Sequence, residues 1–485
     1  MSDKKVSRRK MLKIAGGAAA AVVIAGGAAY LATKPPVTEN VTMSASQTAT
    51  QSMLSTTGAS QTMLPATLEG WQWGTEYGAV DDALSAIATA WNSPEALVAY
   101  TQFPDLTESE FALKVEQAAV GGKPPTLYYM VDTTILSQLA YDGYIAEPPS
   151  DVLDLVKGLM NPTYYDMLNL FSPTGDVTPY LAGVTVGVSC VALYYNTAMF
   201  KAAGLDPTKP PQTWDDLRTA AKALVQRDST GKMTRAGYSV RKAGNPSGIA
   251  EKFIPYAIGN GAKILWKEGG TWYTDINQPP VAEAAQFLHD LIYVDHVDDP
   301  DFPSWGYDPF LNGTCAIAGP LGVGFITNTQ SENPAMQAVT GVTNIPSPGG
   351  IKTAASFGDL QAIGVCSSAP ADQQSDAWDF IRFFNTPANI TAVSNDIWNW
   401  TPYQAALSSP PFSNQETWQA LYSVMSNTGK PAIVNDFGPG ILNFEASLGP
   451  NLARIFTGEI SVQDGLNNTY QAWTNYMATS KFYSG

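Results

Sequence analysis

From Leu68 onward, short apolar runs rich in β-branched residues alternate with stretches whose apolar residues recur at helical spacing. One such run, residues 184–195, ends at Asn196, whose side chain suits the start of a helix that continues through Phe200 and stops at Gly204. This alternation predicts an α/β chain with a largely parallel sheet. Because 485 residues exceed one ordinary core, two domains or a two-lobed unit are expected.

Several predicted helices have identifiable start signals. Thr213 and Asp216 form a capping pair at the start of an amphipathic helix. A Pro-Pro pair at 279–280 opens another helix, Asp372 precedes one that carries Trp378, and Ser461 caps the last predicted helix. No repeat of solenoid or propeller period is visible in the sequence.

The charge distribution argues against several kinds of partner. The formal net charge is −16, yet residues 1–34 hold seven basic residues against the single acid Asp3, so the rest of the chain is strongly acidic. Such a surface repels phosphate backbones, which excludes nucleic acid and polyanionic ligands as expected partners. We therefore expect an exterior that suits a soluble, extracellular protein.

The first residues resemble an export signal. Ser7-Arg8-Arg9-Lys10 precedes an uncharged stretch of residues 14–33, which is similar to a twin-arginine signal and is also long enough to span a bilayer. The basic residues lie before this stretch, so the rest of the chain is expected outside the cell. Residues 1–34 are therefore a signal or an uncleaved anchor, and residues 35–67, rich in Ser and Thr, form a disordered linker. Five Asn-x-Ser/Thr sequons are compatible with an exported archaeal glycoprotein.

The chain lacks the common sequence patterns of catalysis. There is no CxxC, HExxH, G-x-S-x-G or P-loop pattern, so no catalytic residues, cofactor or metal site are expected. The acidic residues Asp295, Asp298, Asp299 and Asp301 suggest either a calcium loop or, as the plainer interpretation, a solvated helix end. The three cysteines are interpreted as buried thiols, and Cys190 with Cys366 is the pair to test for a disulfide if their strands prove adjacent.

A longer motif resembles a known family. Residues 192–206 read ALYYNTAMFKAAGLD, and residues 210–217 read PPQTWDDL. With the later segments 259–262, 310–320 and 378–383, they resemble family 1 extracellular solute-binding proteins, the group that includes maltose-binding protein. The resemblance covers residues 68–476. It implies the type II periplasmic-binding-protein-like fold, in which two α/β lobes close around a solute about a hinge.

The resemblance also implies a domain plan and partners. One lobe contains residues 68–189 and 361–412, and the other contains residues 190–360 and 413–485. The protein is expected to be a monomer that captures a sugar or oligosaccharide and delivers it to the membrane permease of an ABC transporter. It is not expected to be an enzyme. Relatives often have Trp where this chain has Leu321, so a maltodextrin-like pose does not transfer directly.

A sugar presents hydroxyl groups around its rim and C–H groups on its faces, so its site needs carboxylates, amides and flat rings. In open α/β sheets the ligand lies at the carboxyl ends of strands. The candidate residues that follow predicted strands or lie at expected crossovers and loops are Trp73, Glu76, Tyr77, Asp132, Thr133, Asn245, Trp305, Asp308, Phe357, Asp359, Trp398 and Trp400. Asp132 equally suits the start of the next helix.

Three alternative functions stay open at this point. A peptide, a polyol or another small polar solute fits the same fold, because a fold does not fix its ligand. A secreted glycoside hydrolase has a similar composition, although no pair of carboxylates is singled out. A surface adhesin on a stalk is the third class, but its repeats or all-β modules are missing.

Overall fold

The computed structural model describes residues 66–73, 78–91, 96–103, 105–181, 184–303, 307–322, 325, 333–396, 401–410, 412–413, 415–427 and 432–484. The expected signal or anchor of residues 1–34 and most of the expected linker lie outside these residues. Within the described ranges, no helix combines the length and the apolar character needed to cross a bilayer. Residues 63–485 form one compact unit.

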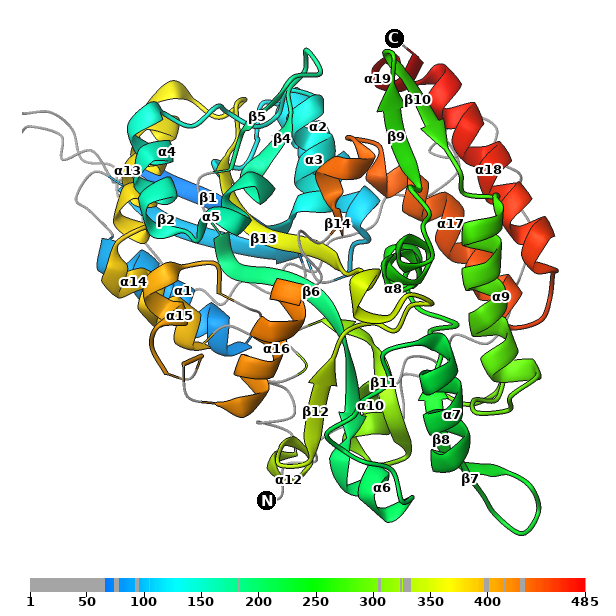
Figure 1. Cartoon of the computed structure of the whole chain (residues 1–485). Helices are drawn as coiled ribbons and strands as arrows, with labels where there is room; N and C mark the ends of the chain where they lie inside the picture. The colour runs from blue at the N-terminus through cyan, green and yellow to red at the C-terminus, as the bar shows by residue number, and fades with distance from the viewer. Residues whose placement is uncertain are drawn as a thin grey trace, which may run out of the picture. The chain divides into compact units, whose positions relative to one another are not determined.

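Strands and helices alternate along the chain, as predicted (Figure 1). The strands are β1 (Ala66–Trp73), β2 (Ala96–Phe103), β3 (Leu127–Asp132), β4 (Asn169–Phe171), β5 (Val177–Pro179), β6 (Val184–Asn196), β7 (Gln226–Arg227), β8 (Met233–Ser239), β9 (Leu265–Glu268), β10 (Thr271–Thr274), β11 (Cys315–Gly322), β12 (Thr340–Thr343), β13 (Phe357–Val365) and β14 (Ala432–Ile433).

The helices are α1 (Gly78–Trp91), α2 (Glu108–Val120), α3 (Thr133–Tyr141), α4 (Ser150–Leu159), α5 (Pro162–Tyr165), α6 (Thr197–Ala202), α7 (Trp214–Leu224), α8 (Pro246–Gly259), α9 (Pro279–Tyr293), α10 (Tyr307–Leu311), α12 (Pro334–Gln337), α13 (Ala371–Phe384), α14 (Pro387–Asp396), α15 (Gln404–Leu407), α16 (Glu416–Asn427), α17 (Ile441–Phe456), α18 (Val462–Thr479) and α19 (Lys481–Ser484).

The main sheet runs in the order β2-β1-β3-β13-β6-β11-β8-β7, with β12 paired to β6 and β14 to β13. β1 is parallel to β2 and β3, and β8 is parallel to β11. Antiparallel pairing of β13 with β3 and β6, and of β11 with β6, reverses the direction between the two halves. The two parallel groups therefore point in opposite directions, each with its carboxyl ends toward the other half.

Two hydrophobic cores pack against this sheet. The first core is built around β1, β3, α2, α3 and α13, with Phe111, Leu136 and Phe380 among its fully buried residues. The second core is built around α8, α9 and α17, with Phe253 and Trp473 in its interior. β6 contributes residues to both cores, because successive side chains of a strand point to opposite faces of the sheet: Ala192 and Tyr194 lie in the first core, and Val191 and Leu193 lie in the second.

The local signals read from the sequence are confirmed at the atomic level. The Asn196 side chain accepts a hydrogen bond from the Met199 N–H and begins α6. Thr213 and Asp216 form a reciprocal capping box at α7, and the Ser461 side chain caps α18. Two details differ: Asp372 lies inside the first turn of α13 rather than before it, and the short helix α19 follows α18.

Cys190 and Cys366 form no disulfide, because Cys366 is a buried free thiol. Their strands β6 and β13 are adjacent, as the prediction required, but Cys190 lies opposite Gly358 in the register. Gly358 precedes Cys366 by eight residues, which is about 26 Å of extended strand. Cys315 is also a buried free thiol, as expected.

Candidate functional site

The carboxyl ends of strands from the two halves meet near the middle of β6. At the end of β3, Asp132 pairs with Gln361 of β13, which pairs in turn with Gly187 of β6. At the end of β11, Gly322 pairs with Val191 of β6. Four residues of β6 separate these levels, or about 13 Å at about 3.3 Å per residue. Polar groups at both sets of strand ends are thereby brought toward one region, which we call the seam.

Side chains fix the two crossing strands at the seam. The Thr133 hydroxyl accepts a hydrogen bond from the Leu360 N–H at 3.3 Å. The Ser356 hydroxyl accepts from the Val191 N–H at 3.1 Å and donates to the Val191 carbonyl at 2.8 Å. Because these bonds join β13 to α3 and to β6, they hold the crossover in register.

A hydrogen bond joins the two halves directly. The Asn245 side-chain amide, just before α8, donates to Glu108 Oε1 at 3.0 Å in the first turn of α2. α2 packs in the first core and α8 in the second. Glu108 is buried, with 7% of its surface exposed, and a carboxylate is rarely found in that state unless it has a polar or charged partner. This pair therefore marks where the two halves come into contact.

An arginine completes the cluster at the seam. Arg241 donates from Nη2 to Asn245 Oδ1 at 2.8 Å. A Cβ atom on Gly248 would lie 2.2 Å from Arg241 Nη2 and 2.5 Å from Asn245 Oδ1, so the glycine leaves the space that the guanidinium occupies. The carboxylate of Glu251 lies close enough to act on the charges of both Glu108 and Arg241, and we call Glu108, Arg241, Asn245 and Glu251 the seam cluster.

The protein environment shifts the charge states in this cluster. Burial is the largest influence on Glu108 and raises its pKa, and the nearby charge of Glu251 acts in the same direction. Asn245 and Arg241 partly oppose this by favouring the carboxylate. Burial likewise lowers the pKa of Arg241, against the opposing charges of Glu251 and Glu108. Both charged groups therefore lie in an environment that is poor in water.

Trp73, at the end of β1, helps to position the start of α2. Its indole N–H donates to the Leu106 carbonyl at 2.8 Å, and its ring packs against the first core. Thr107 follows and forms a capping box with Glu110 at the start of α2. The strand end and the capped helix together hold Glu108 in place.

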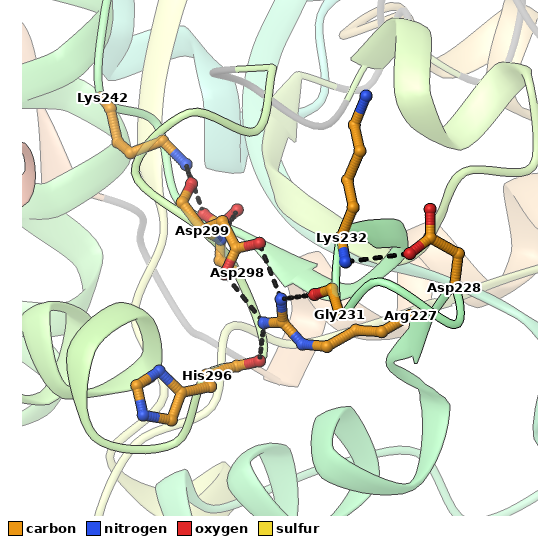
Figure 2. A network of polar contacts seen from close by, with 8 residues as sticks. All are labelled: Arg227, Asp228, Gly231, Lys232, Lys242, His296, Asp298 and Asp299. Atoms are coloured by element: carbon orange, nitrogen blue, oxygen red, sulfur yellow. Dashed lines mark hydrogen bonds and ion pairs between the residues drawn. The ribbon is translucent and has the colours of Figure 1, made fainter.

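In the second half, a buried ion pair holds in place the loop that carries Arg241 and Asn245 (Figure 2). Lys242 Nζ lies 2.7 Å from Asp298 Oδ2, and their side chains are 2% and 0% exposed. Asp298 also accepts from the Val240 N–H at 2.9 Å, while Lys242 donates to the Asp299 carbonyl. Burial raises the pKa of Asp298 to about 6, and the Lys242 ammonium opposes that rise.

The acidic residues near 295–301 are thus paired rather than solvated. Besides Asp298, Asp299 forms two hydrogen bonds with Arg227, and Asp295 is ion-paired with Arg218 and Lys222. The expectation of a solvated helix end is therefore wrong for Asp295 and Asp298, whose side chains are 4% and 0% exposed, whereas Asp299 remains 29% exposed. Among the residues that the structure describes, no cluster of potential ligands could hold a metal ion.

The structure places the predicted site residues in three different situations. Asp132 and Asn245 lie at the seam, Trp73 lies at a strand end, and Asp308 is exposed in the first turn of α10. Thr133 is buried and bonded to β13, and Phe357 is buried in the second core, 5.9 Å from Phe437. The remaining predictions lie outside the described residues or have side chains that are not described: Glu76, Tyr77, Trp305, Asp359, Trp398 and Trp400.

The alternative role of Asp132 as a helix cap is partly answered. Asp132 occupies the position before α3, but its side chain makes no capping hydrogen bond.

Glu108 and Arg241 were missed by sequence reasoning. Glu108 follows the signature Thr107-x-x-Glu110 of a helix start, which explains its position but not its burial against a residue 137 positions away.

Comparison with known proteins identifies sequence relatives. The family described as bacterial extracellular solute-binding protein matches residues 98–420. The sn-glycerol-3-phosphate-binding periplasmic protein UgpB of Pectobacterium atrosepticum is 30% identical over 139 residues, 27% of this chain and 28% of that protein. UgpB of Yersinia pestis is 31% identical over 153 residues, 30% of this chain and 31% of that protein. The alignments thus span less than a third of these curated relatives.

Solved structures match over much more of the chain. A solute-binding protein of Thermotoga lettingae bound with α-D-tagatose has a TM-score of 0.67 at 19% identity, covering 84% of this chain and 98% of that one. Maltose-bound T. maritima MalE3 has a TM-score of 0.68 at 16% identity, covering 85% and 100%. These likenesses confirm the expected two-lobed α/β fold of periplasmic-binding-protein type.

Proposed function

Because this chain belongs to the family of bacterial extracellular solute-binding proteins, we propose that it captures a sugar or oligosaccharide between its two lobes for an ABC importer. The observation that carries the proposal is the seam cluster, in which Glu108 and Asn245 meet from opposite halves. A solute placed there is contacted by both halves, so that its binding favours the closed arrangement.

The chemistry of the seam favours a polyhydroxylated ligand. Carboxylate and amide groups such as Glu108, Asp132 and Asn245 accept hydrogen bonds from hydroxyl groups, and those to a carboxylate are the stronger ones. Trp73 offers an aromatic ring at a strand end. We propose that the other predicted residues that follow strands or lie in nearby loops add rings and acceptors: Glu76, Tyr77, Trp305, Asp308, Asp359, Trp398 and Trp400.

A phosphorylated polyol is the second candidate, because the curated relatives are named for sn-glycerol 3-phosphate. The charges of the seam cluster argue against it. Arg241 already faces the carboxylates of Glu108 and Glu251, and the neighbouring Lys252 is ion-paired with Glu251 at 3.3 Å. A phosphate group at the same place would add about two negative charges to this set of two carboxylates and two cations, and a neutral sugar would not.

The wider role follows the same proposal. We propose that residues 1–34 export or anchor the protein at the outer face of the cell membrane, with residues 35–67 as a linker. The lobes then contain residues 68–189 with 361–412, and residues 190–360 with 413–485. The protein works as a monomer, requires no cofactor or metal, catalyses no reaction, and delivers its ligand to the permease.

Isothermal titration of residues 63–485 tests the ligand class. Tagatose, maltose and mannobiose are compared with sn-glycerol 3-phosphate, amino acids and short peptides. We expect heat of binding with at least one neutral sugar, and a weaker response in Glu108→Gln than in Glu268→Gln, which removes an equal charge from an exposed position on β9. Binding of peptides alone, or of the phosphate ester alone, would overturn the proposal.

A further inference from the structure

A pocket lies between α3 and the carboxyl-terminal helices, apart from the seam. Its volume is about 240 Å³. This is many times the roughly 10–15 Å³ that one water molecule needs, so the pocket has room for a small ligand. The lining residues are Gln138, Tyr141, Asp142, Pro439, Tyr476, Thr479, Ser480 and Lys481.

The α3 wall of this pocket supplies hydrogen-bond acceptors. Gln138 Nε2 donates to Asp142 Oδ2 at 2.5 Å, which turns the amide oxygen of Gln138 away from that bond. This oxygen is buried and has no hydrogen-bond partner among the described residues. A buried acceptor without a partner costs free energy, so the site favours a ligand that carries an N–H or O–H donor.

The negative charge of Asp142 indicates that the hydrogen-bond donor of the ligand is positively charged. Partial desolvation raises the pKa of Asp142, while the Gln138 amide opposes that rise. Lys481 also lines the pocket, but no ion pair joins it to Asp142 within the described ranges. A carboxylate beside an unfilled acceptor attracts a positively charged donor more strongly than a neutral one.

Two tyrosine rings form part of the remaining wall. Tyr476 stacks on Trp473 at 5.2 Å between ring centroids, with 22° between the planes. Tyr141 packs edge-on against Phe482 at 5.3 Å, and Phe482 also contacts Phe171. These contacts hold the rings in place, and aromatic faces attract ammonium groups.

We propose that this pocket binds a small protonated amine, with its N–H groups directed at Gln138 Oε1 and the Asp142 carboxylate and its carbon atoms between Tyr141 and Tyr476. Because α3 packs in the first core and Trp473 in the second, the bound amine contacts both halves of the protein. The site lies at the far end of α3, nine residues or about 13 Å from Thr133. The inference is thus independent of the proposed sugar site.

Ethanolamine is the probe, and ethylene glycol is its uncharged control of nearly equal size. Binding to the purified full chain at neutral pH is followed by saturation-transfer NMR and titration into the millimolar range. We expect ethanolamine to bind and ethylene glycol not to bind. Asp142→Asn should weaken ethanolamine binding about three- to tenfold, while Asp154→Asn, which removes an equal charge from an exposed site on α4, leaves it unchanged.

Thermal unfolding of both variants shows whether they are folded before the comparison. Equal binding of ethylene glycol would overturn the proposal, because the charge would then play no part. An equal loss of ethanolamine affinity in Asp142→Asn and Asp154→Asn would also overturn the proposal, since the effect would then reflect the overall negative charge of the chain. An ethanolamine signal that is displaced by a bound sugar would place the amine at the seam and contradict the assignment.

Discussion

The ion pair of Lys242 and Asp298 offers a quantitative test of how the seam is braced. Lys242→Met removes the ammonium and its two hydrogen bonds, to Asp298 Oδ2 and to the Asp299 carbonyl. Asp298 keeps the Val240 and Asp299 N–H groups as donors but stays fully buried. Breaking a buried pair by removing one partner costs about 3 to 5 kcal/mol, a large part of the stability of an ordinary domain.

The stability lost in Lys242→Met should depend on pH, because Asp298 can take up a proton and become neutral. In the native protein its pKa is about 6, above the value for an unfolded chain, so its contribution to the free energy of unfolding is present below about pH 4 and lost as the pH rises through 6. The Lys242 ammonium lowers the pKa of Asp298, so this pKa is higher in Lys242→Met. The stabilising contribution of neutral Asp298 is therefore lost only at a higher pH in the variant. The variant should therefore be much less destabilised at pH 5 than at pH 8.

Urea unfolding at pH 5 and pH 8 measures both values. Arg227→Met is the matched control, because Arg227 pairs with Asp299 in the same network but both side chains are about 30% exposed. A pair of that kind contributes about 0 to 1 kcal/mol. If Lys242→Met and Arg227→Met lose similar stability, or if the loss in Lys242→Met is the same at both pH values, the reasoning about burial is refuted.

Two further predictions concern single side chains. Glu108→Gln should lower the affinity for the sugar about 10- to 100-fold, which is the difference expected when a charged acceptor becomes neutral. Glu268→Gln should change the affinity little. Titration calorimetry measures both variants, and equal affinities of the two variants for the sugar would show that Glu108 does not belong to the site. Burial raises the pKa of the Cys315 and Cys366 thiols, so both should resist alkylation at pH 8 in the native protein and react in urea, and rapid native labelling of either by mass spectrometry would contradict their burial.

Local features of the fold were readable from the sequence because their causes are local. Asn196 and the Thr213–Asp216 pair act on backbone groups three residues away, and the structure contains both interactions. The alternation of strands and helices likewise depends on short-range periodicity. The fold class could therefore be predicted with the help of the family resemblance.

The site was less accessible because its contacts are distant in sequence. Asn245 was selected from its loop, but its partner Glu108 is 137 residues away. Asp298 was assigned to a solvated loop because nothing near it in the sequence indicates a lysine 56 residues earlier in the same buried space. Phe357 was selected as a ring at a crossover, and its burial in the second core depends on α17 and the preceding turn.

The central claim is that the two halves close around a sugar at the seam. Small-angle X-ray scattering of residues 63–485, with and without a saturating sugar identified by calorimetry, tests it most directly. The radius of gyration should decrease when the sugar binds, because the ligand shifts the population toward the arrangement in which Glu108 and Asn245 are in contact. An unchanged radius of gyration at full occupancy would contradict it.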